Sequence, residues 1–191
     1  MNYKQIIDIF KKTNALLDGH FILTSGRHSS TYFQCAKVLQ YPEYLAAFSI
    51  LIANQFKKLK PDIIISPAIG GIVLGTEVGV QLGCRTIFSE RNKGKMVIRR
   101  GFEINPNDNV LIIEDVITTG GSVKEVMDLV TNSSGNIIGV GVLVDRSNGK
   151  ANLHPNQFSI IELEAISYKD SEIPEDLALI PIQKPGSRYL K

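Results

Sequence analysis

The sequence predicts an α/β fold in which a mostly parallel central sheet carries helices on both faces. Aliphatic runs at residues 63–65, 110–113 and 137–144 indicate buried strands. The first two runs are each followed by a glycine-containing loop and then by a helical pattern. Strands that alternate with helices form parallel sheets, because each crossover helix returns the chain to the same end of the sheet.

The composition is typical of a single soluble domain over residues 1–191, with 43% hydrophobic residues, 21% charged residues and a formal net charge of +2. So small a positive charge gives no argument for nucleic-acid binding, and no stretch is apolar enough to span a membrane. The amphipathic N-terminus lacks the apolar segment of a signal peptide, so we expect a cytoplasmic protein. Cys35 and Cys84 match no metal-binding or redox spacing.

The first part of the chain is expected to hold two helices and a hairpin. Apolar residues near helical spacing predict an amphipathic helix over residues 3–17. Ser25 and Gly26 predict a turn between two short strands. The second helix is expected over residues 42–59, with Pro42 suited to its first turn. Its apolar face comprises Leu45, Phe48, Ile52, Phe56 and Leu59.

Later elements continue the alternation of strands and helices. A helix to about Leu82 follows the first buried strand, and a short strand is expected at residues 85–88. A further strand, expected at residues 158–164, would lie near the sheet edge.

The most informative stretch is VLIIEDVITTGGS, residues 110–122, in which an aliphatic strand ends at Glu114 and Asp115. A hydroxyl- and glycine-rich loop and the start of a helix follow. Glycines let backbone N–H groups point into one concavity, and the N-terminus of a helix adds partial positive charge. A phosphate fits this arrangement, whereas the acids suit sugar hydroxyls or a phosphate-bound Mg²⁺, with Asp115 as the candidate metal ligand. The stretch therefore predicts a site for a phosphorylated sugar.

An ordinary strand–loop–helix turn is the alternative, but it leaves two adjacent acids at a buried strand end unexplained. The sequence contains neither G-x-x-x-x-G-K-[ST] nor the dinucleotide fingerprint G-x-G-x-x-G. EDVITTGGS instead resembles the phosphoribosyl-diphosphate signature of type I phosphoribosyltransferases. That resemblance implies their fold, with the sugar diphosphate bound by Glu114, Asp115, Val116, Ile117, Thr118, Thr119, Gly120, Gly121 and Ser122.

The predicted hairpin offers contacts for a planar base. Tyr32 and Phe33 present flat apolar faces, and Arg27 presents a cation. A polar surface hairpin is the alternative. The segment LTSGRHSSTYFQ resembles the N-terminal segment of orotate phosphoribosyltransferases. We expect this hairpin and the C-terminal tail, at about residues 19–35 and 165–191, to form a small hood over the carboxyl ends of the strands.

Residues 66–71 form a second loop at a strand end. A tight glycine turn is one interpretation. By resemblance, residues 68–71 take the place of the family's diphosphate loop, which often contains a cis peptide that directs backbone N–H groups at the leaving group. Some members carry lysine there, whereas Gly70 and Gly71 would bind through the backbone alone.

Six cations cluster between residues 85 and 100, namely Arg85, Arg91, Lys93, Lys95, Arg99 and Arg100. A solvated loop is the usual explanation for such a run. A substrate with a 5′-phosphate and a diphosphate is strongly anionic, however, and Gly94 suits the hinge of a mobile flap. The flap resembles the family's catalytic loop, which reaches the neighbouring subunit's site, so a homodimer is implied. Arg91, Lys93 and Lys95 are predicted to bind the diphosphate, with Lys95 preferred over Lys93 as the catalytic cation.

Arg146 follows the strand at residues 137–144 within Asp145-Arg146-Ser147. An Asp–Arg pair in solvent is one interpretation. The other is that Arg146 recognises a carboxylate, because strand ends line the ligand crevice of such sheets and a guanidinium can bind a carboxylate through two hydrogen bonds. VDR resembles the orotate family's pattern, and orotate is uracil with a carboxylate. Thr118 would hold a polar edge of the base.

The resemblance extends to PGSR near the C-terminus, although Thr24 replaces a lysine of many members and the tail lacks their Cys-x-x-Cys pair. It implies that orotate and phosphoribosyl diphosphate give orotidine monophosphate and diphosphate, with Mg²⁺, in pyrimidine synthesis. Glu114, Asp115 and Lys95 would be the catalytic residues. Two alternatives remain open: a phosphoribosyltransferase for another base, and a regulator that kept the fold but lost catalysis.

Overall fold

The computed structural model describes residues 1–23, 26–164 and 166–184. Thr24, Ser25 and the PGSR segment at residues 185–188 therefore lie outside the described residues. Within the described ranges, every helix is too short or too polar to cross a membrane.

The chain divides into two compact units, which are described separately. Unit 1 comprises Met1–Val38 and Glu164–Lys191, and unit 2 comprises Leu39–Leu163. The segments predicted to form a hood fall mainly in unit 1. The expectation of a single domain stays a prediction.

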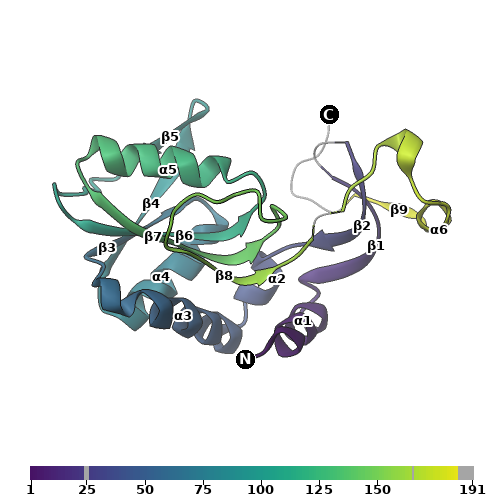
Figure 1. The fold of residues 1–191 in the computed structure, drawn as a ribbon, viewed down its shortest axis with the longest axis horizontal. Helices are drawn as coiled ribbons and strands as arrows, with labels where there is room; N and C mark the ends of the chain where they lie inside the picture. Colours follow the sequence, from purple (N-terminus) through teal and green to yellow (C-terminus); the bar gives the residue numbers. More distant parts are fainter. Residues whose placement is uncertain (24–25, 165, 185–191) are drawn as a thin grey trace. The chain divides into compact units, whose positions relative to one another are not determined.

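Unit 2 is built on a six-stranded sheet with the strand order β5-β4-β3-β6-β7-β8 (Figure 1). Neighbouring strands run parallel except β4 and β5, which form an antiparallel hairpin. Helix α5 covers one face, and α3 and α4 cover the other, which confirms the predicted fold class. The strands are β3 (Ile63–Pro67), β4 (Arg85–Asn92), β5 (Lys95–Ile98), β6 (Asn109–Ile117), β7 (Asn136–Asp145) and β8 (Gln157–Glu162). The helices are α3 (Pro42–Phe56), η1 (Lys57–Leu59), α4 (Gly70–Leu82) and α5 (Gly121–Asn132).

The core of unit 2 is divided between the two faces of this sheet. Ile112 of β6 belongs to a buried cluster with Val123 and Val126 of α5. On the other face, Gly141 of β7 lies against Ile52 of α3. Because helices cover both faces, the central strands can be aliphatic throughout rather than alternating with polar residues.

Unit 1 is built from both ends of the chain. Its three-stranded sheet has the order β2-β1-β9, in which β1 pairs antiparallel with β2 and parallel with β9. The predicted N-terminal hairpin is therefore present. The elements are α1 (Tyr3–Lys12), β1 (Leu16–Ile22), β2 (His28–Phe33), η2 (Asp170–Glu172), α6 (Glu175–Ala178) and β9 (Ile182–Gln183), and the short α2 (Ala36–Leu39) crosses the boundary between the units.

Helix α1 ends at Lys12, five residues before the predicted end at 17. Asn14 adopts a left-handed backbone with φ of 55°. Its N–H donates to the Lys11 carbonyl over 3.0 Å, and the Ala15 N–H donates to the Phe10 carbonyl over 2.8 Å. This hydrogen-bond pattern closes the helix as a Schellman motif. The next two residues, Leu16 and Leu17, belong to β1 instead.

Other element bounds also differ from the predictions. Helix α3 ends at Phe56, and Leu59, in the following single turn, is 39% exposed rather than part of the core face. Strand β4 runs to Asn92, beyond the predicted end at residue 88, because it pairs with β5. Strand β8 occupies the predicted sheet edge.

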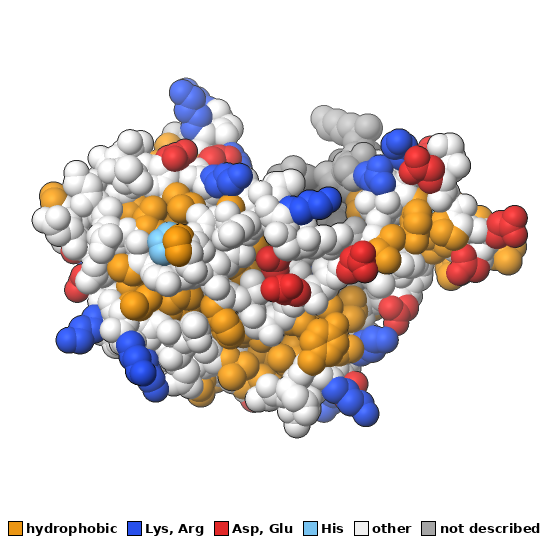
Figure 2. Space-filling model, in the orientation of Figure 1, with side chains coloured by type: hydrophobic (Ala, Val, Ile, Leu, Met, Phe, Trp, Pro, Cys, Tyr) orange, Lys and Arg blue, Asp and Glu red, His pale blue; other side chains and the backbone are white. Residues whose placement is uncertain are grey.

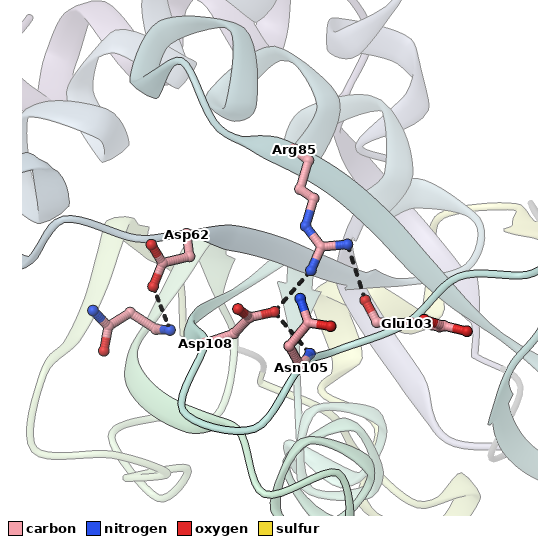
Figure 3. Close-up of polar contacts among 6 residues, drawn as sticks. Asp62, Arg85, Glu103, Asn105 and Asp108 are labelled. Carbon is pink, nitrogen blue, oxygen red and sulfur yellow. Dashed lines mark hydrogen bonds and ion pairs between the residues drawn. The ribbon is translucent and has the colours of Figure 1, made fainter.

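An ion-pair cluster fastens the connection between β5 and β6 to the start of β4 (Figure 3). Arg85 donates to the Asp108 carboxylate over 2.7 Å and to the Glu103 carbonyl over 3.1 Å. The same carboxylate accepts the N–H of Asn105 over 2.8 Å. Arg85 begins β4 and therefore lies at the amino end of the parallel strands. It has a structural role, separate from the other cations of the predicted cluster.

A chain of buried histidines joins the hairpin to the C-terminal segment within unit 1. His20 Nε2 lies 2.6 Å from His28 Nδ1, and His28 Nε2 lies 2.8 Å from Asp170 Oδ1. His28 and Tyr168 also exchange two backbone hydrogen bonds of 2.8 Å. Because both histidines are buried, their ring nitrogens depend on these partners rather than on water.

His28→Ala should therefore destabilise unit 1. The change leaves the buried His20 ring without its side-chain partner, which typically costs about 1–3 kcal/mol of unfolding free energy. Urea denaturation would measure the loss. Lys169→Ala is the control, because Lys169 forms an exposed ion pair with Glu172 nearby. Equal stability of the two variants would contradict a structural role for the histidine chain.

Candidate functional site

Two acids of β6 lie at the centre of the candidate site in unit 2. Strand β6 continues to Ile117, where it pairs with Asp145 of β7, so the acids lie inside the strand rather than at its end as predicted. Glu114 is only 7% exposed, and Asp115 is half-buried. The N–H of Asp115 donates to Glu114 Oε1 over 3.1 Å.

Gly70 and Gly71 let the start of α4 approach these acids. A Cβ atom at Gly70 would lie 2.1 Å from Asp115 Oδ2, and one at Gly71 would lie 3.0 Å from Glu114 Oε1. Any side chain at position 70 would therefore displace the Asp115 carboxylate. The peptide bond between Ala68 and Ile69 is cis, as the resemblance to diphosphate loops implies. The structure thus brings together two motifs that lie far apart in the sequence.

The environment of Glu114 favours its protonated form. Burial raises the pKa of Glu114 well above its ordinary value, and the neighbouring Asp115 raises it further. A cation or hydroxyl donor that reached this carboxylate would favour its ionised form instead.

Residues 118–122 line a cavity of about 260 Å³ at the amino end of α5. Gly120 has a left-handed backbone with φ of 73°, and a Cβ atom there would lie 2.7 Å from Leu153 Cδ2. The N–H groups in the first turn of a helix have no acceptor within the helix, so those of α5 can bind an anion. The cavity walls are Arg91, Glu114, residues 116–123 and Glu125.

The predicted flap is a β-hairpin whose turn is formed by Lys93 and Gly94. Both residues have positive φ, 50° and 83°, as the commonest two-residue hairpin turn requires. A cation lies at the tip of this hairpin, at the top of Figure 2. Lys95 begins β5 opposite Asn92. Closure of the hairpin over a ligand stays a prediction.

Arg91 lies on the cavity wall and is held by Glu125 of α5. Its Nη2 donates to Glu125 Oε1 over 2.8 Å, and its Nη1 donates to Glu125 Oε2 over 3.0 Å. Nη1 also donates to the Gly94 carbonyl over 3.0 Å. The hydrogen bond from Arg91 lowers the pKa of Glu125. The predicted diphosphate ligand is therefore already paired with a carboxylate.

Most of the other clustered cations are paired as well. The pairs are Arg85 with Asp108 at 2.7 Å, Arg99 with Glu90 at 3.5 Å and Arg100 with Glu90 at 3.0 Å. Lys93 and Lys95 are exposed, and neither forms an ion pair within the described part of the chain. These two lysines are therefore the cations most accessible to an anionic ligand.

Arg146 follows β7 at the carboxyl end of the sheet and is half-buried. Its backbone N–H donates to the Ile117 carbonyl over 2.8 Å, which places Arg146 beside the start of the cavity loop. The preceding Asp145 is buried and accepts the N–H of Ser147 over 2.7 Å. Asp145 thus holds the turn that carries Arg146.

The two aromatic residues of the hairpin that are predicted to face a base lie in unit 1, and their surroundings differ from each other. Phe33 is 7% exposed and packs edge-on against Phe10, with ring centroids 4.9 Å apart. Tyr32 points to the opposite face of β2, because successive strand residues alternate. Stacking of a base on these rings stays a prediction, and Tyr32 is the more exposed of the two. Arg27 Nε donates to Ser167 Oγ over 2.8 Å and so joins the hairpin to the C-terminal segment.

Two residues of the site were not found by the sequence analysis. Glu125 lies four residues after Gly121, so a helical spacing places it on the same face of α5 as the loop. That spacing is a signal that could have revealed it. Leu153 comes from the connection between β7 and β8, and no local sequence signal relates it to Gly120.

Glu114→Gln should make the protein more stable at alkaline pH. Because the folded-state pKa of Glu114 is raised, the native state holds this proton more tightly, and the associated stability is lost as pH rises through that pKa. Glutamine cannot ionise and avoids this loss. Thermal melting should show similar stability below the ordinary pKa of 4.5 and a growing advantage for the variant above it.

Glu103→Gln is the control for this experiment, because the Glu103 side chain is exposed. A stability difference for Glu114→Gln that is independent of pH would contradict the raised pKa.

The chain matches the family model described as a phosphoribosyl transferase domain over residues 36–176. It is 57% identical to the orotate phosphoribosyltransferase of Chlorobium phaeobacteroides over 98% of this chain and 97% of the relative. A crystal structure of orotate phosphoribosyltransferase from Aeropyrum pernix has the same fold, with a TM-score of 0.71 at 22% identity over 83% of this chain and 93% of that one. Adenine phosphoribosyltransferase from Thermoanaerobacter pseudethanolicus also shares the fold, with a TM-score of 0.61 at 16% identity over 70% of this chain and 88% of that one. The chain therefore belongs to the phosphoribosyltransferase family, where it groups with the orotate phosphoribosyltransferases.

Proposed function

We propose that the chain transfers the phosphoribosyl group of phosphoribosyl diphosphate to orotate, which gives orotidine monophosphate and diphosphate in pyrimidine synthesis. One observation carries this proposal: Glu114 and Asp115 of β6, the loop at residues 118–122 and the start of α4 lie together near the carboxyl end of β6. The identity to orotate phosphoribosyltransferases over nearly their whole length supports orotate as the base.

The cavity loop would anchor the 5′-phosphate of the sugar. Thr118, Thr119 and Ser122 offer hydroxyl groups, and the first turn of α5 offers backbone N–H groups and partial positive charge. Binding at the phosphate, remote from the reacting carbon, would hold the ribose in the orientation that reaction requires.

Glu114 and Asp115 would bind the ribose hydroxyls. Departure of the diphosphate builds positive charge on the ribose, and two carboxylates in a partly buried site can balance that charge. Gly70 and Gly71 keep this side of the acids free of side chains and would offer backbone N–H groups to the diphosphate. Lys95 is the preferred catalytic cation for the leaving group, and Lys93 is the alternative.

The residues present also fit Mg²⁺, which prefers oxygen ligands and commonly binds through one or two carboxylates together with substrate phosphates. Glu114 and Asp115 are the suitable carboxylates here, and Asp115 is the more accessible of the two. Within the described residues, no group of three or more potential ligands is arranged to hold a metal by itself. When bound, the ion would neutralise charge on the diphosphate.

Arg146 would bind the carboxylate of orotate, and Thr118 a polar edge of the base. Tyr32 stays a predicted stacking partner. We further propose a homodimer, because the sequence of the hairpin resembles the family's loop that reaches the neighbouring subunit, and we propose a cytoplasmic location. Sedimentation of the full chain would test the dimer.

The proposed reaction is tested by following the ultraviolet absorbance of orotate with phosphoribosyl diphosphate and Mg²⁺, beside adenine, hypoxanthine and uracil. Consumption of orotate that requires both other components is the expected result. Activity on another base alone would overturn the choice of base. Binding of phosphoribosyl diphosphate without turnover of any base would favour a regulator.

Arg146→Ala should raise the KM for orotate about 10- to 100-fold, because a hydrogen bond to a charged group contributes roughly 1.5–3 kcal/mol. The KM for phosphoribosyl diphosphate should change little. Steady-state kinetics with Lys150→Ala, an exposed cation in the same connection, provide the control. An equal rise in the KM values for orotate and for phosphoribosyl diphosphate would show that Arg146 does not select the base.

Gly70→Ala should lower kcat/KM about 100-fold, as misplacement of a reacting group by about 1 Å can do. The added methyl group displaces the Asp115 carboxylate, which is the mobile end of a side chain, so folding should survive. Val80→Ala on the exposed face of α4 is the control for both activity and melting temperature. Retained activity in Gly70→Ala would contradict the role of Asp115.

A further inference from the structure

Among the described residues, Glu125 and Glu114 are the carboxylates on the wall of the cavity proposed to bind a phosphate. Glu125 comes from the second turn of α5, four residues after the glycine that begins the helix. An unpaired carboxylate there would repel an anionic ligand. Here it forms two hydrogen bonds with Arg91 of β4, so the pair is neutral as a whole.

The geometry of this pair leaves one edge of the guanidinium free. Glu125 occupies the end formed by Nη1 and Nη2, and the Gly94 carbonyl takes the second hydrogen of Nη1. Among the described residues, none accepts a hydrogen bond from Nε or from the Nη2 hydrogen beside it. These two N–H groups form a planar fork, which matches two oxygens of one phosphate.

We infer that Glu125 is a positioning residue that orients Arg91 so that its free edge binds a phosphate group of the sugar diphosphate. The inference rests on the proposed function, since it names how the same site binds that substrate. Glu125 contacts Arg91 rather than the substrate. It also links β4, the hairpin turn and α5, because Arg91 bonds to Glu125 and Gly94 together.

An exposed ion pair without a role is the simpler explanation. Arg91 is 47% exposed and Glu125 is 40% exposed, and such pairs contribute little to stability. The two explanations differ in substrate binding. If the pair has no role, removing the Glu125 charge should leave the affinity for phosphoribosyl diphosphate unchanged. If Glu125 positions Arg91, the same change should weaken that affinity.

Glu125→Gln is the test, because glutamine keeps the size of the side chain and loses one charge-assisted hydrogen bond. We expect phosphoribosyl diphosphate to bind about tenfold more weakly in a calorimetric titration, with a matching rise in its KM. The KM for orotate, kcat and the melting temperature should stay near the parent values. Asp128→Asn, one turn further along α5 and exposed, removes the same charge without touching Arg91.

Arg91→Ala distinguishes action through the arginine from a general effect of charge. In that background Glu125→Gln should cause no further loss of phosphoribosyl diphosphate binding, because the arginine through which Glu125 acts is gone. Removal of the carboxylate, which is unpaired in that background, should instead restore part of the binding. The inference would be overturned if the two substitutions weakened phosphoribosyl diphosphate binding additively. It would also be overturned if Glu125→Gln bound phosphoribosyl diphosphate as tightly as Asp128→Asn does.

The titration also separates this inference from the proposed reaction. If the parent binds phosphoribosyl diphosphate but does not consume orotate, the reaction is wrong and the Glu125 effect on binding still decides the inference. If the parent does not bind phosphoribosyl diphosphate, both are overturned.

Discussion

The close approach of α4 to the acids of β6 is the constraint on which the rest of the site depends. Strands β3 and β6 are parallel neighbours, so the loop that follows each of them emerges at the same edge of the sheet. The space that a side chain at position 70 would fill is taken by the Asp115 carboxylate. Because Gly70 and Gly71 have no side chains, Glu114 and Asp115 can lie close to the backbone that follows β3 as well as to the loop that follows β6.

The interior of the fold was predictable because burial leaves a local signature. The run Val110–Ile113 is aliphatic because helices cover both faces of the sheet, and the loop chemistry of residues 118–122 follows directly from its glycines and hydroxyls. The bounds of the elements and the partners of the side chains were less predictable, because they depend on the backbone conformation of single residues and on residues distant in the sequence. Leu16 and Leu17 continue a helical spacing, yet Asn14 ends the helix before them. Phe33 has a ring suited to stacking, but Phe10 covers it.

Charge in this protein is compensated locally, and a count of cations overstates the positive field near the site. Arg85, Arg91, Arg99 and Arg100 each lie within 4 Å of a carboxylate oxygen in the structure. Two exposed lysines at the hairpin tip keep their accessible charge. The paired arginines are consequently better suited to fixed geometry, and the lysines to contacts that form when a ligand arrives.

The construction of unit 1 from both chain ends bears on the order of folding. Residues Leu39–Leu163 of unit 2 are continuous in sequence and can fold as they leave the ribosome. The hairpin is made first, yet His28 pairs with Tyr168 and His20 pairs with Ile182. Closing so long a loop costs chain entropy before these contacts form. The hairpin is thus synthesised before unit 2, yet it acquires its full set of partners only after unit 2 and the segment around Tyr168 have been made.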